Sequence, residues 1–272
     1  MASNDDVEAV TSNPNFEIIT TLAYSFGLPV NEASLPVPHC YLLQHGIDRL
    51  RAAALDLSWT AVVQELGSSH RLRSLSSEID THMTSAYGEA SQDPNKGFIV
   101  RLAFNKDGVL SIMSGPRPSS KDPLYPTSLP NEPPASAVMP VYLDPAPTTP
   151  SLLTKHKTTY RDPYNAAWER AGLDDTTSLA ECDVLLQNED GHVMGAVFRT
   201  VYFYRKGGFV TPSEETGCKI GVSRRWALEN AGVEEALISA ADVVEGGVVW
   251  LSSAVGGFIR GRVTMGKKTS AM

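Results

Sequence analysis

Closely spaced cysteines, long apolar runs and an excess of positive charge are all missing from this 272-residue chain. Its three cysteines, Cys40, Cys182 and Cys218, lie far apart and show no metal-binding spacing, which predicts reduced thiols and no metal site. The longest mostly apolar run, residues 246–259, is too short and too rich in Gly and Ser to span a bilayer. The polar start lacks the basic and apolar regions of a signal peptide, so we expect a cytoplasmic protein without a membrane partner.

The charge balance excludes a further class of partner. The net charge is −8, and an acidic chain is repelled by phosphate backbones, so we expect no nucleic-acid partner. Apolar residues make up 42% of the chain and charged residues 20%, which is an ordinary globular mixture. The length suffices for one large domain or two smaller ones around separate cores.

The first half of the chain alternates strand and helix patterns. Leu50, Leu55 and Trp59 lie close to one stripe of a predicted helix. Asp107-Gly108 between two alternating apolar runs predicts a hairpin. This half therefore predicts an α+β domain, with strands at 16–26, 39–44, 97–104 and 109–113, and helices at 47–59, 60–66 and 74–85.

A proline-rich segment from residue 115 to 151 predicts an inter-domain connection. We therefore divide the chain into a disordered tail (1–14), a small N-terminal α+β domain with the connection (15–150), a larger C-terminal domain (151–266) and a second tail (267–272). Ser223 is the predicted N-cap of a helix in the larger domain. The second half contains predicted strands at 138–143, 184–188, 192–197, 200–205, 209–211, 244–252 and 258–263, and predicted helices at 164–171, 224–231 and 235–240.

Residues 155–164, Lys-His-Lys-Thr-Thr-Tyr-Arg-Asp-Pro-Tyr, contain the candidate nucleophile, Lys157. A lysine becomes able to form a Schiff base with an aldehyde cofactor when burial or nearby cations lower its pKa. Lys155 and Arg161 add positive charge nearby. The same letters also suit two solvated lysines on a linker, and they do not decide between Lys155 and Lys157.

Three further features suggest an anion site. Gly221-Val222-Ser223 opens a predicted helix, whose free N–H groups and positive dipole end favour a phosphate. The Ser252-Ser253 pair at the end of a predicted strand could supply more donors. Arg49 could point at the same phosphate. Taken one by one, these features also suit a helix cap, a polar turn and a surface charge pair with Asp48.

Five stretches match motifs of one enzyme family and occur in the same order along the chain: LLQHGIDRLRAAA (42–54), HKTTYRDPYNAAWERAG (156–172), DVLLQNEDGHV (183–193), RKGGFVTP (205–212) and GCKIGVSRRWALENAG (217–232). Together they resemble the fold-type IV pyridoxal-phosphate enzymes, which include branched-chain and D-amino-acid aminotransferases and aminodeoxychorismate lyases. The resemblance spans residues 16–263 and is closest to the fungal lyases. It implies an α+β, two-domain architecture like that of D-amino-acid aminotransferase.

The resemblance also implies an activity and a partner. The chain would be a homodimeric lyase that eliminates pyruvate from an amino-chorismate-type small molecule, with pyridoxal 5′-phosphate (PLP) as cofactor. The implied roles are Lys157 as the catalytic lysine that binds the cofactor covalently, Arg49, Val222, Ser223 and Ser253 at its phosphate, and Tyr24, Arg161 and Tyr164 at the substrate.

Several positions depart from the family pattern. The family glutamate that pairs with the pyridine nitrogen, and so strengthens the ring as an electron sink, falls on Gly195. The small polar residues that follow it are Ala196, Val197 and Phe198 here. Gly46 replaces a usual histidine, and the Asn-Gly-x-Arg-Gly stretch of the fungal lyases reads Ser-Ala-Val-Gly-Gly at 253–257. Two alternatives follow: a relative that catalyses an isomerisation, cyclisation or elimination without PLP, or a non-catalytic binding protein.

Overall fold

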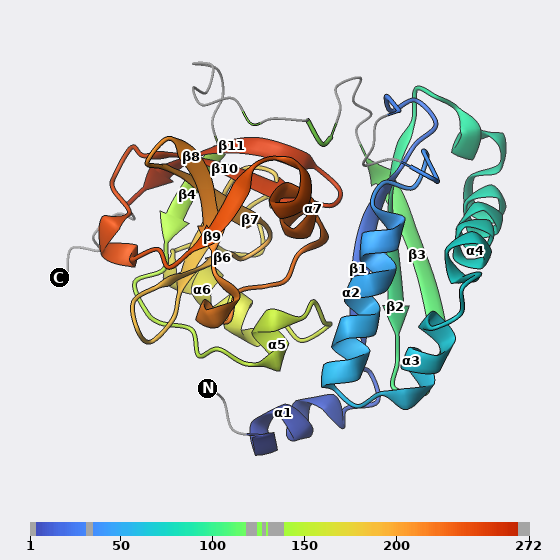
Figure 1. The fold of residues 1–272 in the computed structure, drawn as a ribbon, viewed down its shortest axis with the longest axis horizontal. Helices are drawn as coiled ribbons and strands as arrows, with labels where there is room; N and C mark the ends of the chain where they lie inside the picture. Colours follow the sequence, from blue (N-terminus) through green and yellow to red (C-terminus); the bar gives the residue numbers. More distant parts are fainter. Residues whose placement is uncertain (1–3, 31–34, 118–123, 127–128, 130–138, 266–272) are drawn as a thin grey trace.

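The computed structural model describes residues 4–30, 35–117, 124–126, 129 and 139–265, in which two β-sheets lie side by side (Figure 1). The smaller sheet has the order β1-β2-β3, and the larger has the order β6-β5-β4-β11-β10-β7-β8-β9. This mixed architecture confirms the α+β prediction. The tail predicted at 267–272 lies outside the described residues. Within the described part, no helix is long and apolar enough to cross a membrane.

The smaller sheet is an antiparallel meander of β1 (Ile18–Tyr24), β2 (Gly97–Phe104) and β3 (Leu110–Arg117). The predicted hairpin between β2 and β3 is confirmed, and Gly108 has the positive φ of +83° that its turn requires. β1 is the central part of the predicted first strand, and its side chains are almost all buried, which requires cover on both faces of the sheet.

Helices α2 (Leu43–Asp56), α3 (Thr60–Leu66) and α4 (Arg71–Tyr87) pack against the smaller sheet and place Leu50 and Ile79 in its core (Figure 1). The 3-10 helix η2 (Gly88–Gln92) then leads into β2. Leu55 was wrongly assigned to the buried stripe of α2, because the helix turns it outward and leaves it 53% exposed.

Two other N-terminal predictions were wrong. The strand predicted at 39–44 is reduced to one isolated bridge, between Tyr24 and Cys40, because α2 begins at Leu43. A helix, α1 (Asn4–Thr11), lies where we expected a disordered tail, and Val7 and Val10 pack against the N-terminal core. Helices this short are marginal in water by themselves, so these contacts with the core stabilise α1.

The larger sheet is mixed. β4 lies in the predicted connection, yet it pairs in parallel with both β11 and β5 inside this sheet. The helix predicted at 235–240 was wrong at its start, where the chain pairs with β8 as strand β9. The strands are β4 (Met139–Leu143), β5 (Asp183–Gln187), β6 (Val193–Ala196), β7 (Thr200–Arg205), β8 (Gly208–Pro212), β9 (Val233–Ala236), β10 (Val248–Ser253) and β11 (Gly257–Thr264).

Three helices accompany this sheet: α5 (Leu152–Lys155), α6 (Asp162–Arg170) and α7 (Val222–Asn230). Short 3-10 turns, η3 (Glu214–Thr216) and η4 (Ala240–Asp242), join its strands. Figure 1 shows α7 facing α2 across the gap between the two sheets. Arg225 of α7 donates to Asp48 of α2 at 2.6 Å, and this ion pair helps to fix the two halves against each other.

The packing of α2 gives a test of the fold. Leu50→Ala should lower the free energy of unfolding by about 2–5 kcal/mol, because the side chain is 1% exposed and its loss leaves a cavity. Leu55→Ala in the same helix is the matched control and should change stability by less than about 1 kcal/mol. Urea denaturation measures both. Equal losses would contradict the described orientation of the helix.

Candidate active site

A pocket lies between the two sheets and collects most of the predicted site residues. It encloses about 530 Å³ of empty space, including open solvent at its mouth. Residues from α2, the segment after α5, the turn between β6 and β7, the start of α7 and the end of β10 form its wall. The lining residues are Thr21, Arg49, Lys157, Arg161, Val197, Phe198, Arg199, Thr200, Lys219, Gly221, Val222, Ser223, Ser252, Ser253 and Ala254.

Lys157 reaches this pocket because its backbone is fixed to β1. Ser151 and Thr154 form a capping box at the start of α5, and the chain becomes extended after Lys155. The carbonyl of Lys157 then accepts a hydrogen bond from the backbone N–H of Ile19 at 2.9 Å. Its Nζ donates to Thr21 Oγ1 at 3.0 Å. The amine is thereby aimed across the gap between the sheets.

The sequence did not decide between Lys155 and Lys157, and the structure places their two side chains in different surroundings. Lys155 Nζ forms an ion pair with Asp56 Oδ2 at 2.7 Å and does not line the pocket. The carbonyl of Lys155 accepts a hydrogen bond from the N–H of Ile220 at 3.0 Å, which joins this segment to the start of α7. Of these two lysines, only Lys157 lines the pocket.

The start of α7 and the end of β10 form a wall of hydrogen-bond donors, which we call the serine cradle (Gly221, Val222, Ser223, Ser252 and Ser253). Gly221, not Ser223 as predicted, is the N-cap, and because glycine has no side chain it cannot cap the N–H groups of the first turn. Ser252 Oγ donates to Ser223 Oγ at 2.9 Å. Free backbone donors, hydroxyls and the positive helix end together suit a phosphate.

Two arginines bring unpaired positive charge into the pocket. The Nε and Nη2 atoms of Arg49 and the Nη2 atom of Arg161 are buried and have no hydrogen-bond partner among the described residues. Burial lowers the pKa of Arg49 to about 10. A buried guanidinium without a partner costs free energy, so an anionic ligand is the expected source of compensation.

Both pocket lysines have lowered pKa values. Burial is the main cause for Lys157, and the charges of Arg49, Lys219 and Arg161 lower its pKa further. Burial, followed by the charges of Arg161 and Arg49, lowers the pKa of Lys219 to about 7. A lysine that can lose its proton near neutral pH can act as a nucleophile or as a proton carrier.

The predicted substrate residues do not all reach the pocket. Arg161 lines it, with its guanidinium carbon 5.1 Å from the centroid of the Tyr164 ring. Tyr164 supports Arg161 from behind and donates to the carbonyl of Thr154 at 3.0 Å. The role predicted for Tyr24 does not fit its position, because its ring is 2% exposed within the N-terminal core and its hydroxyl donates to Asp80.

The end of the site near Gly195 carries no negative charge. Gly195 lines a second, adjoining hollow of about 350 Å³, which shares Arg199, Thr200 and Lys219 with the main pocket. Neither space is lined by an Asp or Glu within the described part of the chain. Asp183, the acid whose charge acts on Lys219, is fully buried and pairs with Arg199 at 3.0 Å.

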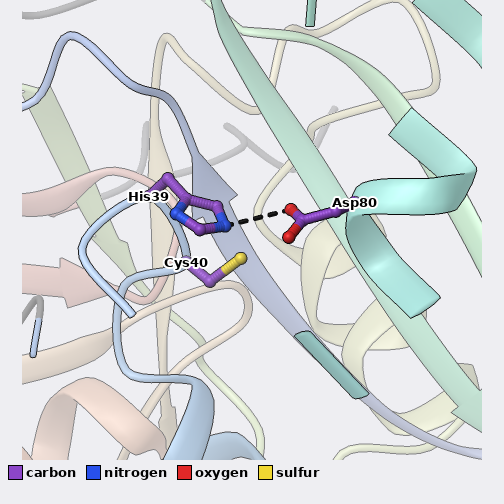
Figure 2. A group of neighbouring side chains, drawn as sticks. All are labelled: His39, Cys40 and Asp80. Atoms are coloured by element: carbon purple, nitrogen blue, oxygen red, sulfur yellow. Dashed lines mark hydrogen bonds and ion pairs between the residues drawn. The ribbon is translucent and has the colours of Figure 1, made fainter. Parts of the chain in front are cut away.

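A second polar group lies in the N-terminal half, outside this pocket. Figure 2 shows His39, Cys40 and Asp80, whose potential metal-ligand atoms all lie within 4.8 Å of one another. His39 Nε2 lies 3.0 Å from Asp80 Oδ1, and burial followed by the Asp80 charge raises the pKa of the Cys40 thiol. Because Tyr24 also donates to Asp80, we interpret the group as a polar link between β1 and α4.

Sequence reasoning missed four polar lining residues: Thr21, Arg199, Thr200 and Lys219. Lys219 had a usable signal, because it stands two residues before Gly221 and so had to lie near any anion at that helix start. Thr21 and Arg199 had none. Their positions depend on how β1 and the turn between β6 and β7 meet across the two sheets.

Comparison with known proteins identifies the family. The model of the amino-transferase class IV family matches residues 76–262, which is more than half of the chain. The chain belongs to the class IV aminotransferase family. This confirms the resemblance drawn from the five stretches, and the members of this family are enzymes.

Individual relatives show how far the similarity extends. Aminodeoxychorismate lyase of Saccharomyces cerevisiae is 32% identical over 130 residues, which cover 43% of this chain and only about a third (35%) of the yeast protein. A solved structure from Mesorhizobium loti matches with a TM-score of 0.63 at 20% identity, covering 92% of this chain and 100% of that one.

A further structure bears on the cofactor. A hypothetical aminotransferase from Mycobacterium tuberculosis, solved with α-ketoglutarate and PMP bound, matches with a TM-score of 0.59 at 14% identity, covering 94% of this chain and 83% of that one. At these identities the solved structures show the fold alone. Cofactor binding by this chain therefore has to be judged from its own residues.

Those residues fit one part of PLP and not another. The serine cradle and the unpartnered guanidinium of Arg49 fit its phosphate, and the amine of Lys157 fits its aldehyde. No described carboxylate lines the pocket for its ring nitrogen, and Gly195 has a φ of +130°, where a side chain would be strained. The anchoring residues are present, and the group that would strengthen the ring as an electron sink is not.

Arg49 gives a test of this charge balance. Arg49→Met should raise the free energy of unfolding by about 1 kcal/mol in phosphate-free buffer, because it removes a buried cation that has no partner. The same variant should lose the increase in melting temperature that inorganic phosphate gives the wild type. Urea denaturation and thermal unfolding measure the two effects.

Arg51→Met is the matched control on the same helix, because that side chain is exposed. It should change stability by less than about 0.5 kcal/mol and should keep the response to phosphate. An Arg49→Met variant that is less stable than the wild type and still responds to phosphate would contradict the proposed charge balance.

Proposed function

We propose that this protein is a lyase of the aminodeoxychorismate lyase type, which eliminates pyruvate from an amino-chorismate-type substrate with PLP bound at Lys157. One observation carries the proposal. The pocket that presents the Lys157 amine is also lined by the serine cradle and by Arg49, so a single phosphate-bearing aldehyde can reach the anion site and the amine together. The similarity to the yeast lyase supports the same reaction class.

Each side chain has a distinct part in this proposal. Arg49 and the serine cradle bind the phosphate and fix the depth of the cofactor in the pocket. When bound, PLP would supply the covalent attachment of the substrate amine and a conjugated ring that stabilises developing negative charge. Thr21 holds the Lys157 amine at 3.0 Å, and the surrounding cations favour its neutral, proton-accepting form.

Lys157 can serve as base and then as acid in the elimination. The neutral amine removes a ring proton from the substrate, and the ammonium so formed returns a proton as the enolpyruvyl group leaves. Pyruvate and 4-aminobenzoate are the products, so no oxidant or reductant is needed. A lysine whose pKa is lowered toward working pH is suited to both steps.

The missing carboxylate bears on the choice of reaction within the family. Transamination depends on the cofactor ring to stabilise a carbanion, and that stabilisation is weaker without an acid at the ring nitrogen. An elimination that forms an aromatic ring gains driving force from its own product. The absence of Asp and Glu from the described pocket lining therefore weakens the usual route for both reactions, and only the elimination has an aromatic product as a compensating driving force.

The same observation favours a second candidate. Gly195 and the cationic lining would also suit a family member that has lost PLP and catalyses an isomerisation, cyclisation or elimination on an anionic small molecule. A non-catalytic binding protein would share the pocket but not the chemistry. The homodimer and the cytoplasmic location stay predictions in each case.

A direct test loads the purified full-length protein with PLP. The wild type should gain a visible absorption band. Borohydride should bleach this band and attach the cofactor permanently to a peptide that contains Lys157. Lys157→Met should lose the band and at least about 10³-fold of 4-aminobenzoate formation, the loss expected when a nucleophile that also acts as base and acid is removed.

Lys155→Met is the control, since its amine pairs with Asp56 outside the pocket. It should keep both the band and the product. If the wild type takes up no PLP and still turns over an amino-chorismate, the cofactor-free enzyme is favoured. If it shows neither band nor product, the lyase proposal fails.

A further inference from the structure

Arg161 and Lys219 converge on one wall of the pocket, formed by the start of α6 and the turn between β6 and β7. The guanidinium carbon of Arg161 lies 5.1 Å from the centroid of the Tyr164 ring and 4.7 Å from that of Phe198. Lys219 Nζ lies 4.3 Å from the centroid of the same Tyr164 ring. Contacts between cations and aromatic faces thus hold both charged groups at the pocket lining.

Both cations retain unused hydrogen-bond donors. Lys219 Nζ donates to the carbonyl of Val197 at 3.2 Å, which leaves two of its three N–H groups for a ligand. The Nη2 atom of Arg161 is buried and has no partner in the part of the chain that the structure describes. Asp183 could offset this charge, but its carboxylate is bound to Arg199 at 3.0 Å.

The position of Lys219 reverses the charge expected at this end of the site. Gly195, where the family pattern has a carboxylate, and Lys219 line the same hollow beside the main pocket. A carboxylate there would attract a protonated ring nitrogen. An ammonium group attracts an anion instead, and together with Arg161 it offers several N–H donors to the same anion.

We propose that Arg161 and Lys219 form a carboxylate-binding subsite, separate from the serine cradle. When no cofactor ring fills the space beside Gly195, the pocket takes two anionic groups at once, a phosphate at the cradle and a carboxylate at this subsite. The rings of Tyr164 and Phe198 beside the two cations give the subsite an aromatic wall, which suits a carboxylate carried on an unsaturated ring. This inference rests on the proposed function in one respect only, which is the choice of an aminobenzoate as the test ligand.

Proton uptake should distinguish this subsite from a fixed positive charge. Because the pKa of Lys219 is lowered to about 7, a carboxylate placed beside it raises that pKa and draws a proton onto the amine. Carboxylate affinity should therefore fall as the pH rises above 7. The charged and titratable groups that face Lys219 are Arg161 and Tyr164 from α6, Arg49 from α2, Lys157, Asp183 from β5, Arg199 and Cys218.

The test uses 4-aminobenzoate as probe and 4-aminobenzamide as its neutral match. Calorimetric titration of the full-length protein without added cofactor measures both affinities between pH 6 and 9. The benzoate should bind at least about tenfold more tightly than the benzamide at pH 6.5. Its affinity should fall about tenfold per pH unit just above pH 7, whereas the benzamide affinity should stay constant.

Variants assign the effect to a residue. Lys219→Met should weaken benzoate binding by roughly 10- to 100-fold and remove the pH dependence. Lys219→Arg should keep the affinity and lose the pH dependence, because arginine stays charged throughout this range. Lys155→Met is the matched control, because the amine of Lys155 pairs with Asp56 outside the pocket, and it should match the wild type in both respects.

A folded Lys219→Met variant that binds benzoate as the wild type does, with the same pH dependence, would overturn the proposal. So would equal binding of benzoate and benzamide. If Lys219→Met fails to fold, Arg161→Gln and Lys219→Arg decide. Arg161→Gln should weaken binding about tenfold and move the pH at which affinity falls upward, because the charge of Arg161 no longer lowers the pKa of Lys219. Failure of PLP loading at Lys157 would remove the proposed lyase function and leave the subsite standing, so the two results are separable.

Discussion

Uncompensated positive charge in one pocket is the constraint on which the rest of this site depends. Arg49, Lys157, Arg161 and Lys219 line the pocket, and no described carboxylate lines it with them. Burial, followed by mutual repulsion, lowers the pKa of both lysines. The buried guanidinium atoms of Arg49 and Arg161 have no hydrogen-bond partner in the part of the chain that the structure describes. Such an arrangement costs stability, and the explanation that we propose is a ligand that carries negative charge.

The fold holds these like charges together by attaching each to a different element. The carbonyl of Lys157 is bound to β1, and the carbonyl of Lys155 is bound to the start of α7. Arg49 is carried by α2, which Asp48 ties to α7 through Arg225. Because the two halves of the chain meet along these contacts, residues of both halves line the pocket.

Sequence alone gave much of this picture where the signal was local. The Asp107-Gly108 hairpin follows from turn chemistry, and Lys157 and the Gly221 helix start follow from the family pattern. Other features depend on contacts distant in the sequence. The burial of Tyr24, the exposure of Leu55 and the pairing of β9 follow from tertiary packing, and Lys219 becomes a site residue only when Tyr164 and Val197 lie beside it.

A crystal structure grown with selenate would test the central claim most directly, because selenium locates bound anions by anomalous scattering. The account predicts a selenate in the pocket, within hydrogen-bond distance of the Arg49 guanidinium and of the Ser223 hydroxyl, with the Lys157 amine facing the same space. An empty pocket, with selenate bound only elsewhere or with Arg49 turned toward a carboxylate, would contradict it.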